Sequence, residues 1–171
     1  SEVEQQAAML GLPESRRAQL SEGSIPELVK ARAPAAVWVA STPSGGTFPF
    51  HVDSGVSHYY GVGAYQRPFE DARRAGVRFA AECLAFSNVP DAAGIGLTMR
   101  DGETPGSHPR WKARVPRDAG VGWDFEDVRD HYVERLFGVA PADLRARDPE
   151  RYLALGRVAS GEAMLRTFSE W

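Results

Sequence analysis

The chain has 171 residues, of which 43% are apolar and 25% charged, and its formal net charge is -3. This is enough chain for one ordinary globular domain with a hydrophobic core. The slight negative charge argues against a nucleic-acid binder, which usually presents a basic face. The single cysteine, Cys83, excludes an internal disulfide framework and the cysteine-rich zinc patterns. No apolar stretch is long enough to cross a bilayer, so we expect no membrane partner.

The first third of the chain is predicted to be mainly helical. Ser1 and Glu4 have the spacing of a capping box, and residues 5–10 read as the helix that follows it. Two further helices are expected over residues 14–20 and 25–33. Because the sequence begins without methionine at a helix start, we expect the chain to be a piece of a longer protein.

Three short apolar runs predict buried strands over residues 36–40, 56–62 and 77–81. They alternate with irregular or helical segments, including a short charged helix over residues 68–75. This alternation favours an α/β arrangement with parallel strands.

The second half changes in character at about residue 91. Residues 91–122 are rich in Gly, Pro, Arg and Asp and are too long for an ordinary connection, so we expect a loop that walls a binding cleft. Residues 123–171 are predicted to be helical, and this segment is divided into helices over 124–137, 141–146 and 149–171.

Glu82 is the residue that most strongly points to chemistry. It lies in the apolar run 77–86, where an ionised carboxylate costs several kcal/mol unless it is compensated. Parallel strands place ligands at their carboxyl ends, which favours a Glu facing a cleft. The alternative is a Glu that points outward at a strand end and pairs with Arg78.

Aromatic and polar residues at 58–60 suit a carbohydrate site. His58, Tyr59 and Tyr60 could offer a sugar both an apolar platform and hydrogen bonds, although core packing is the commoner role for each. The histidines match no metal-ligand spacing, so we expect no metal and no cofactor. Those four histidines are His51, His58, His108 and His131.

Two other groups of residues have a simpler structural explanation. In the long loop, Trp111, Lys112 and Arg114 could touch a ligand, but an anchoring indole among surface charges explains them equally well. Four acidic residues near position 125 are expected to form a solvated helix face. They are Asp124, Glu126, Asp127 and Asp130.

Three segments, residues 38–46, 58–65 and 78–90, resemble in order and spacing the β-mannosidase branch of family 2 glycoside hydrolases. The resemblance implies a TIM-barrel catalytic domain whose acid/base Glu ends the fourth strand and whose nucleophile Glu ends the seventh. On this basis we expect a partial (β/α)8 barrel, about strands 5–7, with residues 1–90 as barrel strands and loops. The missing barrel strands and sandwich domains would then lie elsewhere in the same polypeptide.

The same resemblance assigns roles to individual residues. The run RFAAE at 78–82 places the nucleophile on Glu82, and Ser1 with Glu2 looks like the tail of the acid/base motif, which places the acid/base on Glu2. His58, Tyr60, Trp38 and Tyr59 would bind substrate. Ser1 stands where the family usually has Asn, and Tyr60 and Gly63 stand at positions where Trp is common.

The predicted function is therefore a retaining glycoside hydrolase of β-linked sugars, most directly β-mannosides. Its two carboxyl groups should lie about 5–5.5 Å apart. The alternatives are β-galactoside or β-glucuronide specificity, an inactive carbohydrate-binding barrel, and a fragment without a site, for which the two carboxyl groups would lie more than about 10 Å apart. The resemblance points to a bacterial protein, which we expect in the cytoplasm, and activity of the 171-residue chain alone is doubtful.

Overall fold

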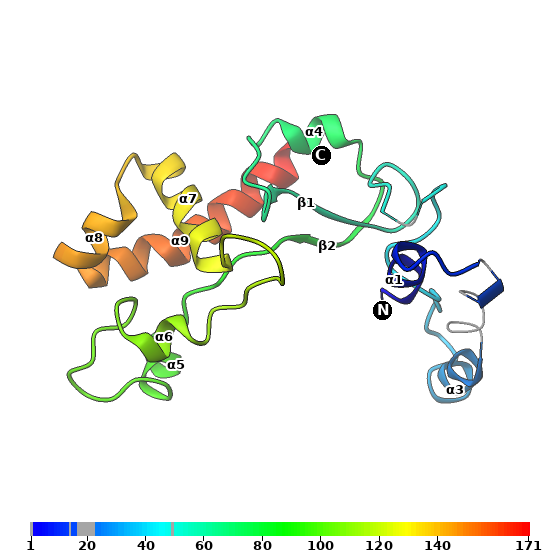
Figure 1. The fold of residues 1–171 in the computed structure, drawn as a ribbon, viewed down its shortest axis with the longest axis horizontal. Helices are drawn as coiled ribbons and strands as arrows, with labels where there is room; N and C mark the ends of the chain where they lie inside the picture. Colours follow the sequence, from blue (N-terminus) through cyan, green and yellow to red (C-terminus); the bar gives the residue numbers. More distant parts are fainter. Residues whose placement is uncertain (1, 14, 17–22, 49) are drawn as a thin grey trace. The chain divides into compact units, whose positions relative to one another are not determined.

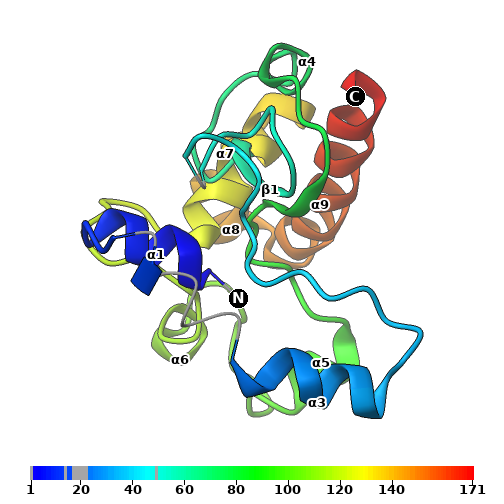
Figure 2. The same cartoon turned by 90° about the vertical axis from the view of Figure 1, so that its right-hand side faces the viewer.

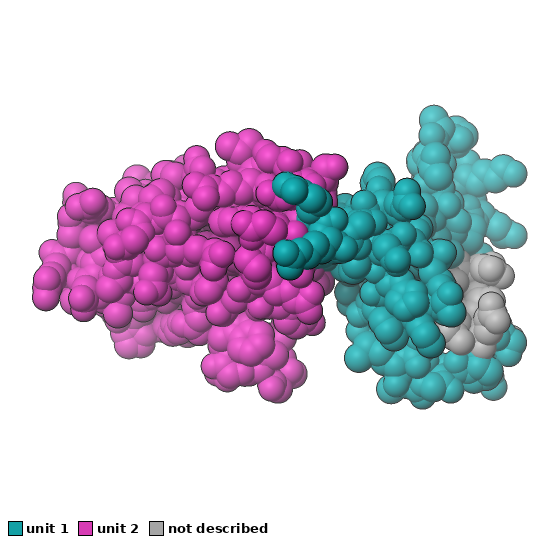
Figure 3. Space-filling model, turned by 90° about the horizontal axis from the view of Figure 1, so that it is seen from above, with its two compact units in different colours: residues 1–59, 73–83 teal, residues 60–72, 84–171 magenta. Residues whose placement is uncertain are grey.

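The computed structural model describes residues 2–13, 15–16, 23–48 and 50–171. The chain divides into two compact units, which Figure 3 colours separately. The first unit comprises Ser1–Tyr59 and Arg73–Cys83, and the second comprises Tyr60–Ala72 and Leu84–Trp171. Within the described residues, no helix is long and apolar enough to cross a membrane.

The first unit begins with helix α1, Val3–Met9, and continues with α3, Ser24–Arg32. The start of α1 is capped from a distance, because the backbone N–H of Glu4 donates a hydrogen bond of 3.0 Å to Ser41 Oγ. The capping role predicted for Ser1 lies outside the described residues, as does most of the helix predicted over 14–20. The prediction of a helix over 25–33 is confirmed.

Two parallel strands, β1 (Ser57–Gly63) and β2 (Ala80–Leu84), form a single sheet. At one end the Ser57 N–H donates to Phe79 O, and at the other the Ala64 N–H donates to Leu84 O, both at 2.8 Å. The short helix α4, Asp71–Ala75, lies between the strands in sequence. β1 falls where a strand was predicted, whereas β2 starts three residues later than expected and has Glu82 at its centre.

The prediction of a partial TIM barrel is wrong. The described residues form eight helices and one two-stranded sheet, and a barrel needs a closed ring of strands. The run at 36–40 is not a strand, and the side chain of Val37 is exposed. An apolar run indicates burial but says nothing about a partner strand, and here the run pairs with none among the described residues.

The second unit is mostly helical, as predicted for the C-terminal half (Figure 1). Asp124 starts α7 with a capping box, accepting from the backbone of Asp127 while the Asp127 side chain accepts from the Asp124 N–H. The predicted long loop contains two short helices of its own. The five helices are α5 (Ala92–Gly96), α6 (Pro109–Lys112), α7 (Phe125–Phe137), α8 (Pro141–Arg147) and α9 (Pro149–Glu170).

Helix α9 packs against α7 and α8 (Figure 2). Several of the buried residues of α9 are small. Gly156 is one of these, and a Cβ added there would approach Val89 Cγ2 to 2.9 Å and Arg129 Nε to 3.2 Å. The absence of a side chain at this position therefore lets α7 and α9 approach closely. The buried small residues of α9 are Gly156, Ala159, Ser160, Ala163 and Thr167.

Buried charged side chains contact one another near the N-terminal end of α7. Glu126 and Arg129 are fully buried, and Glu126 accepts a hydrogen bond of 2.6 Å from Trp111 Nε1. Arg129 and Arg145 both donate to the hydroxyl of Tyr152, and burial raises the pKa of that hydroxyl. The prediction that the acidic residues form a solvated face is thus wrong for Glu126, because the Trp111 indole and two guanidinium groups compensate its charge.

Candidate functional site

Glu2, His58 and Glu82 come together in the first unit, although 80 residues of sequence separate the two carboxylates. Glu2 is the residue directly before α1, His58 lies in β1, and Glu82 is the central residue of β2. The parallel pairing of β1 with β2 brings His58 next to Glu82, and α1 brings Glu2 to the same place. We call these three residues the carboxylate–histidine cluster.

The imidazole of His58 lies between the two carboxylates. Its Nδ1 is 3.0 Å from Glu2 Oε1, a hydrogen-bond distance, and its Nε2 is 3.8 Å from Glu82 Oε1. The His58 side chain is 4% exposed, whereas those of Glu2 and Glu82 are 41% and 57% exposed. A buried base therefore supports two carboxylates that face solvent.

The two carboxylates of the cluster lie close to each other. One potential ligand atom from each of the three residues lies within 4.8 Å of the others, so an oxygen of Glu2 and an oxygen of Glu82 are no further apart than this. Retaining glycosidases need about 5–5.5 Å between their carboxyl groups, whereas inverting enzymes need about 6.5–9.5 Å. The distance of more than about 10 Å expected of a fragment without a site is not observed.

The burial argument for Glu82 was wrong, although the residue does lie in the cluster. The middle of β2 is exposed, so Glu82 pays no large desolvation cost in this structure. Its neighbour Cys83 is half-buried, and burial raises the pKa of that thiol. Glu82 is the more exposed of these two adjacent residues.

The backbone after Glu82 is held in an uncommon conformation. Leu84 and Ala85 have φ values of 76° and 60°, in the left-handed region that residues with a side chain rarely adopt. Such conformations cost of order 1–3 kcal/mol each and concentrate at functional sites. This strain lies two and three residues beyond Glu82 and is a second observation that marks the end of β2.

The other residues predicted to bind sugar are placed less favourably. Tyr59 follows His58 in β1, so its side chain points to the opposite face of the strand, and its 2% exposure favours the core-packing role. Tyr60 is half-buried. Trp38 is exposed and lies outside any strand. Substrate binding by Trp38 and Tyr60 stays a prediction.

The cluster has the donor types of a metal site, which the spacing of the histidines did not reveal. Zinc bound at about 2.0–2.2 Å from its ligands holds them about 3–3.5 Å from each other, and the three ligand atoms here all lie within 4.8 Å of one another. The Nδ1 of His58 is at hydrogen-bond distance from Glu2. This contact favours proton exchange through the ring over coordination of a metal by that nitrogen.

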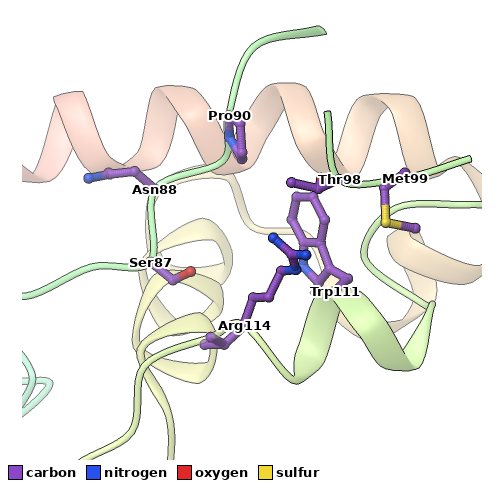
Figure 4. Close-up of a pocket in the computed structure, with 8 residues that line it drawn as sticks. Ser87, Asn88, Pro90, Thr98, Met99, Trp111 and Arg114 are labelled. Atoms are coloured by element: carbon purple, nitrogen blue, oxygen red, sulfur yellow. The ribbon is translucent and has the colours of Figure 1, made fainter. Parts of the chain in front are cut away.

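A separate pocket of about 110 Å³ lies in the second unit (Figure 4). It is lined by Trp111 of α6 and by Arg114, which follows that helix, together with residues of the 87–99 segment. The Trp111 indole is pinned by its hydrogen bond to Glu126, and Lys112 binds the carboxylates of Asp124 and Glu126. Trp111 thus has the anchoring role expected of the indole, and because it also lines the pocket with Arg114, ligand contact by this segment stays a prediction.

Comparison with models of known protein families, with curated proteins and with solved structures gives no match for this chain. The support for the candidate site therefore comes from its own geometry alone. Sequence reasoning named all three members of the cluster, but it missed that His58 contacts both carboxylates, because no local pattern relates positions 2, 58 and 82.

Proposed function

We propose that the protein is a retaining glycoside hydrolase in which Glu82 is the nucleophile and Glu2 the acid/base. The observation that carries this proposal is the pair of solvent-facing carboxylates whose nearest oxygens lie within 4.8 Å of each other. Carboxylates whose nearest oxygens are this close support double displacement, in which the two carboxyl groups lie about 5–5.5 Å apart, over an inverting mechanism, in which they lie about 6.5–9.5 Å apart.

In the first step a carboxylate oxygen of Glu82 attacks the anomeric carbon and the bond to the leaving-group oxygen breaks. Glu2 gives its proton to that oxygen, so the products are a glycosyl ester on Glu82, a neutral alcohol and an ionised Glu2. In the second step water attacks the same carbon, its proton passes to Glu2, and the ester bond breaks. Glu82 leaves as a carboxylate, and both residues return to their starting states.

The substrate we propose is a β-mannoside, on the strength of the resemblance of segments 38–46, 58–65 and 78–90. β-Galactosides and β-glucuronides share the anomeric chemistry and are the sugars to test beside it. The proposed compartment, a bacterial cytoplasm, rests on the same resemblance and on the free Cys83.

The test is covalent trapping in the intact protein. A 2-deoxy-2-fluoro-β-mannosyl fluoride slows both steps but speeds the departure of the leaving group, so the glycosyl-enzyme accumulates. We expect a mass increase of one fluorosugar, mapped to the peptide that contains Glu82, and no increase in Glu82→Gln. Arg78→Gln, which alters a neighbouring residue of the same segment, is the matched control and should still be labelled.

Three outcomes separate the alternatives. Labelling by the galactosyl or glucuronyl probe alone would change the proposed substrate and leave the proposed mechanism in place. Absence of any label, together with retained binding of β-linked sugars in calorimetry, would replace the enzyme by a carbohydrate-binding protein. A label on any residue other than Glu82 would overturn the assigned nucleophile.

A further inference from the structure

The imidazole of His58 presents one ring nitrogen to each carboxylate of the cluster. Nδ1 lies 3.0 Å from Glu2 and Nε2 lies 3.8 Å from Glu82. Both nitrogens of the ring therefore face protein acids. The distance at Nε2 is longer than a hydrogen bond, and it is the 4% exposure of the side chain that limits contact with a sugar hydroxyl, which was its expected role.

A neutral imidazole carries one N–H and one lone pair, so it cannot treat the two carboxyl groups alike. If the proton is on Nε2, that N–H points toward Glu82 and favours the ionised carboxylate there. Nδ1 then offers only a lone pair, and the 3.0 Å contact is a hydrogen bond only if Glu2 donates it as a carboxylic acid. If the proton is instead on Nδ1, Glu2 is held ionised and the Nε2 lone pair faces the negative charge of Glu82.

We infer that His58 is a positioning residue that, as the Nε2–H tautomer, accepts a hydrogen bond from protonated Glu2 and faces ionised Glu82. The inference rests on the proposed function, since it assigns the protonation states that a retaining hydrolase needs before its first step. In this arrangement the buried ring gives the two carboxyl groups different protonation states, although their exposed fractions are similar.

The buried position of His58 keeps its ring next to the two carboxylates. The ring belongs to β1, and the start of this strand is held to the residue before β2 by two contacts from Ser57, which donates from its N–H and its Oγ to Phe79 O at 2.8 and 3.2 Å. The ring lies at hydrogen-bond distance from Glu2 and faces Glu82, so it is placed to orient both carboxylates.

Kinetics of two amide variants test the inference in the intact protein. In His58→Asn the amide takes about the place of Nδ1, so the contact with Glu2 is kept, whereas in His58→Gln it takes about the place of Nε2 and that contact is lost. We expect kcat/KM of His58→Gln to fall about 10- to 100-fold for substrates with poor leaving groups, which need the acid, and by less than about threefold for dinitrophenyl glycosides, which do not. His58→Asn should recover most of this loss.

A sugar-binding role would instead raise KM equally for both kinds of substrate, and a purely structural role would lower both rates together in both variants. Either result would overturn the inference. Labelling of Glu82 in the wild-type protein by the fluorosugar tells these outcomes apart from a failure of the proposed function. If the wild-type protein takes no label, the proposed function fails, and the catalytic meaning of His58 fails with it.

Nitrogen NMR of the intact protein, labelled with ¹⁵N-histidine, provides a readout that does not depend on turnover. Replacement of His58 identifies its signals, and we expect a protonated Nε2 and an unprotonated, hydrogen-bonded Nδ1. Glu2→Gln should shift the Nδ1 signal, while Glu4→Gln, two residues further along the chain in α1, should not. A protonated Nδ1, whether Nε2 is bare or protonated as well, would contradict the inference even if the protein proves to be a retaining hydrolase.

Discussion

The indole nitrogen of Trp111 lies 2.6 Å from a carboxylate oxygen of Glu126, and both side chains are buried in the second unit. The same carboxylate lies 3.4 Å from Arg129 and 3.2 Å from Arg145. A residue of the long 91–122 segment is thus joined to α7 and α8 through one acid. A segment that composition marks as an irregular loop is held in place by a compensated buried charge.

Replacement of Glu126 should test how much the second unit depends on this acid. Glu126→Ala leaves the fully buried Arg129 with one carboxylate fewer, so we expect a loss of about 3–5 kcal/mol in the free energy of unfolding. Glu126→Gln keeps an acceptor for the Trp111 N–H and should cost less. Urea denaturation measures both. Glu134→Ala, at an exposed position of α7, is the control and should change stability by less than about 0.5 kcal/mol.

Asp124 combines a helix cap with an ion pair, and two substitutions separate the two contributions. Its carboxylate caps α7 and lies 2.6 Å from Lys112 Nζ. Asn also caps a helix, so Asp124→Asn should remove only the ion pair, worth up to about 1 kcal/mol at this partly exposed site. Asp124→Ala should cost about 1 kcal/mol more, because the cap is lost as well.

The ion pair of Asp124 should also give a pH signature. Burial is the largest single influence and alone would raise the pKa of this carboxyl, but the hydrogen bond and charge of Lys112, together with the backbone N–H groups of Asp127 and Glu126, hold the pKa below its ordinary value of 3.8. A lowered pKa in the folded state stabilises the protein above the unfolded value, and this stability is lost as the pH falls through the folded value. The difference between wild type and Asp124→Asn should thus persist from pH 7 to 5 and shrink below about 3.8. A difference that disappears between pH 7 and 5 would implicate another group.

Gly63 is required where β1 leaves the sheet. Its φ is +105°, and a Cβ added there would overlap the carbonyl oxygen of Leu84, while its N–H donates at 2.8 Å to the Tyr132 hydroxyl. Gly63→Ala should lower the free energy of unfolding by at least about 3 kcal/mol, because backbone strain and overpacking each cost about 1–3 kcal/mol. Gly161→Ala, in an open position of α9, should instead stabilise the protein by up to about 1 kcal/mol in the same denaturation experiment.

Sequence reasoning succeeded where the signal is local and failed where it depends on partners. Helix α7 was located to within one residue because Asp124 and Asp127 provide a cap that acts over four residues. The strand at 36–40 failed because apolarity cannot specify pairing, and the barrel failed with it. Glu126 was placed on a solvated face because, besides Arg129 on the same helix, its compensating groups lie 15 and 19 residues away, at Trp111 and Arg145. The charge pattern along one helix cannot reveal these two distant partners.

Metal removal provides a test of the cluster that is independent of the trapping experiment. Because Glu2 and Glu82 act through protons and a covalent ester in the proposed mechanism, we expect hydrolysis by the intact protein to be unchanged after dialysis against EDTA. Added Zn²⁺ should inhibit, since it would compete for His58 Nε2 and the two carboxylates, and Glu2→Gln should bind Zn²⁺ more weakly in calorimetry. Loss of activity on dialysis, restored by one equivalent of a divalent ion, would contradict this. In that case the 3.0 Å contact of His58 with Glu2 would belong to a metal-binding site, and the proposed hydrogen bond from a protonated Glu2 to His58 would be wrong.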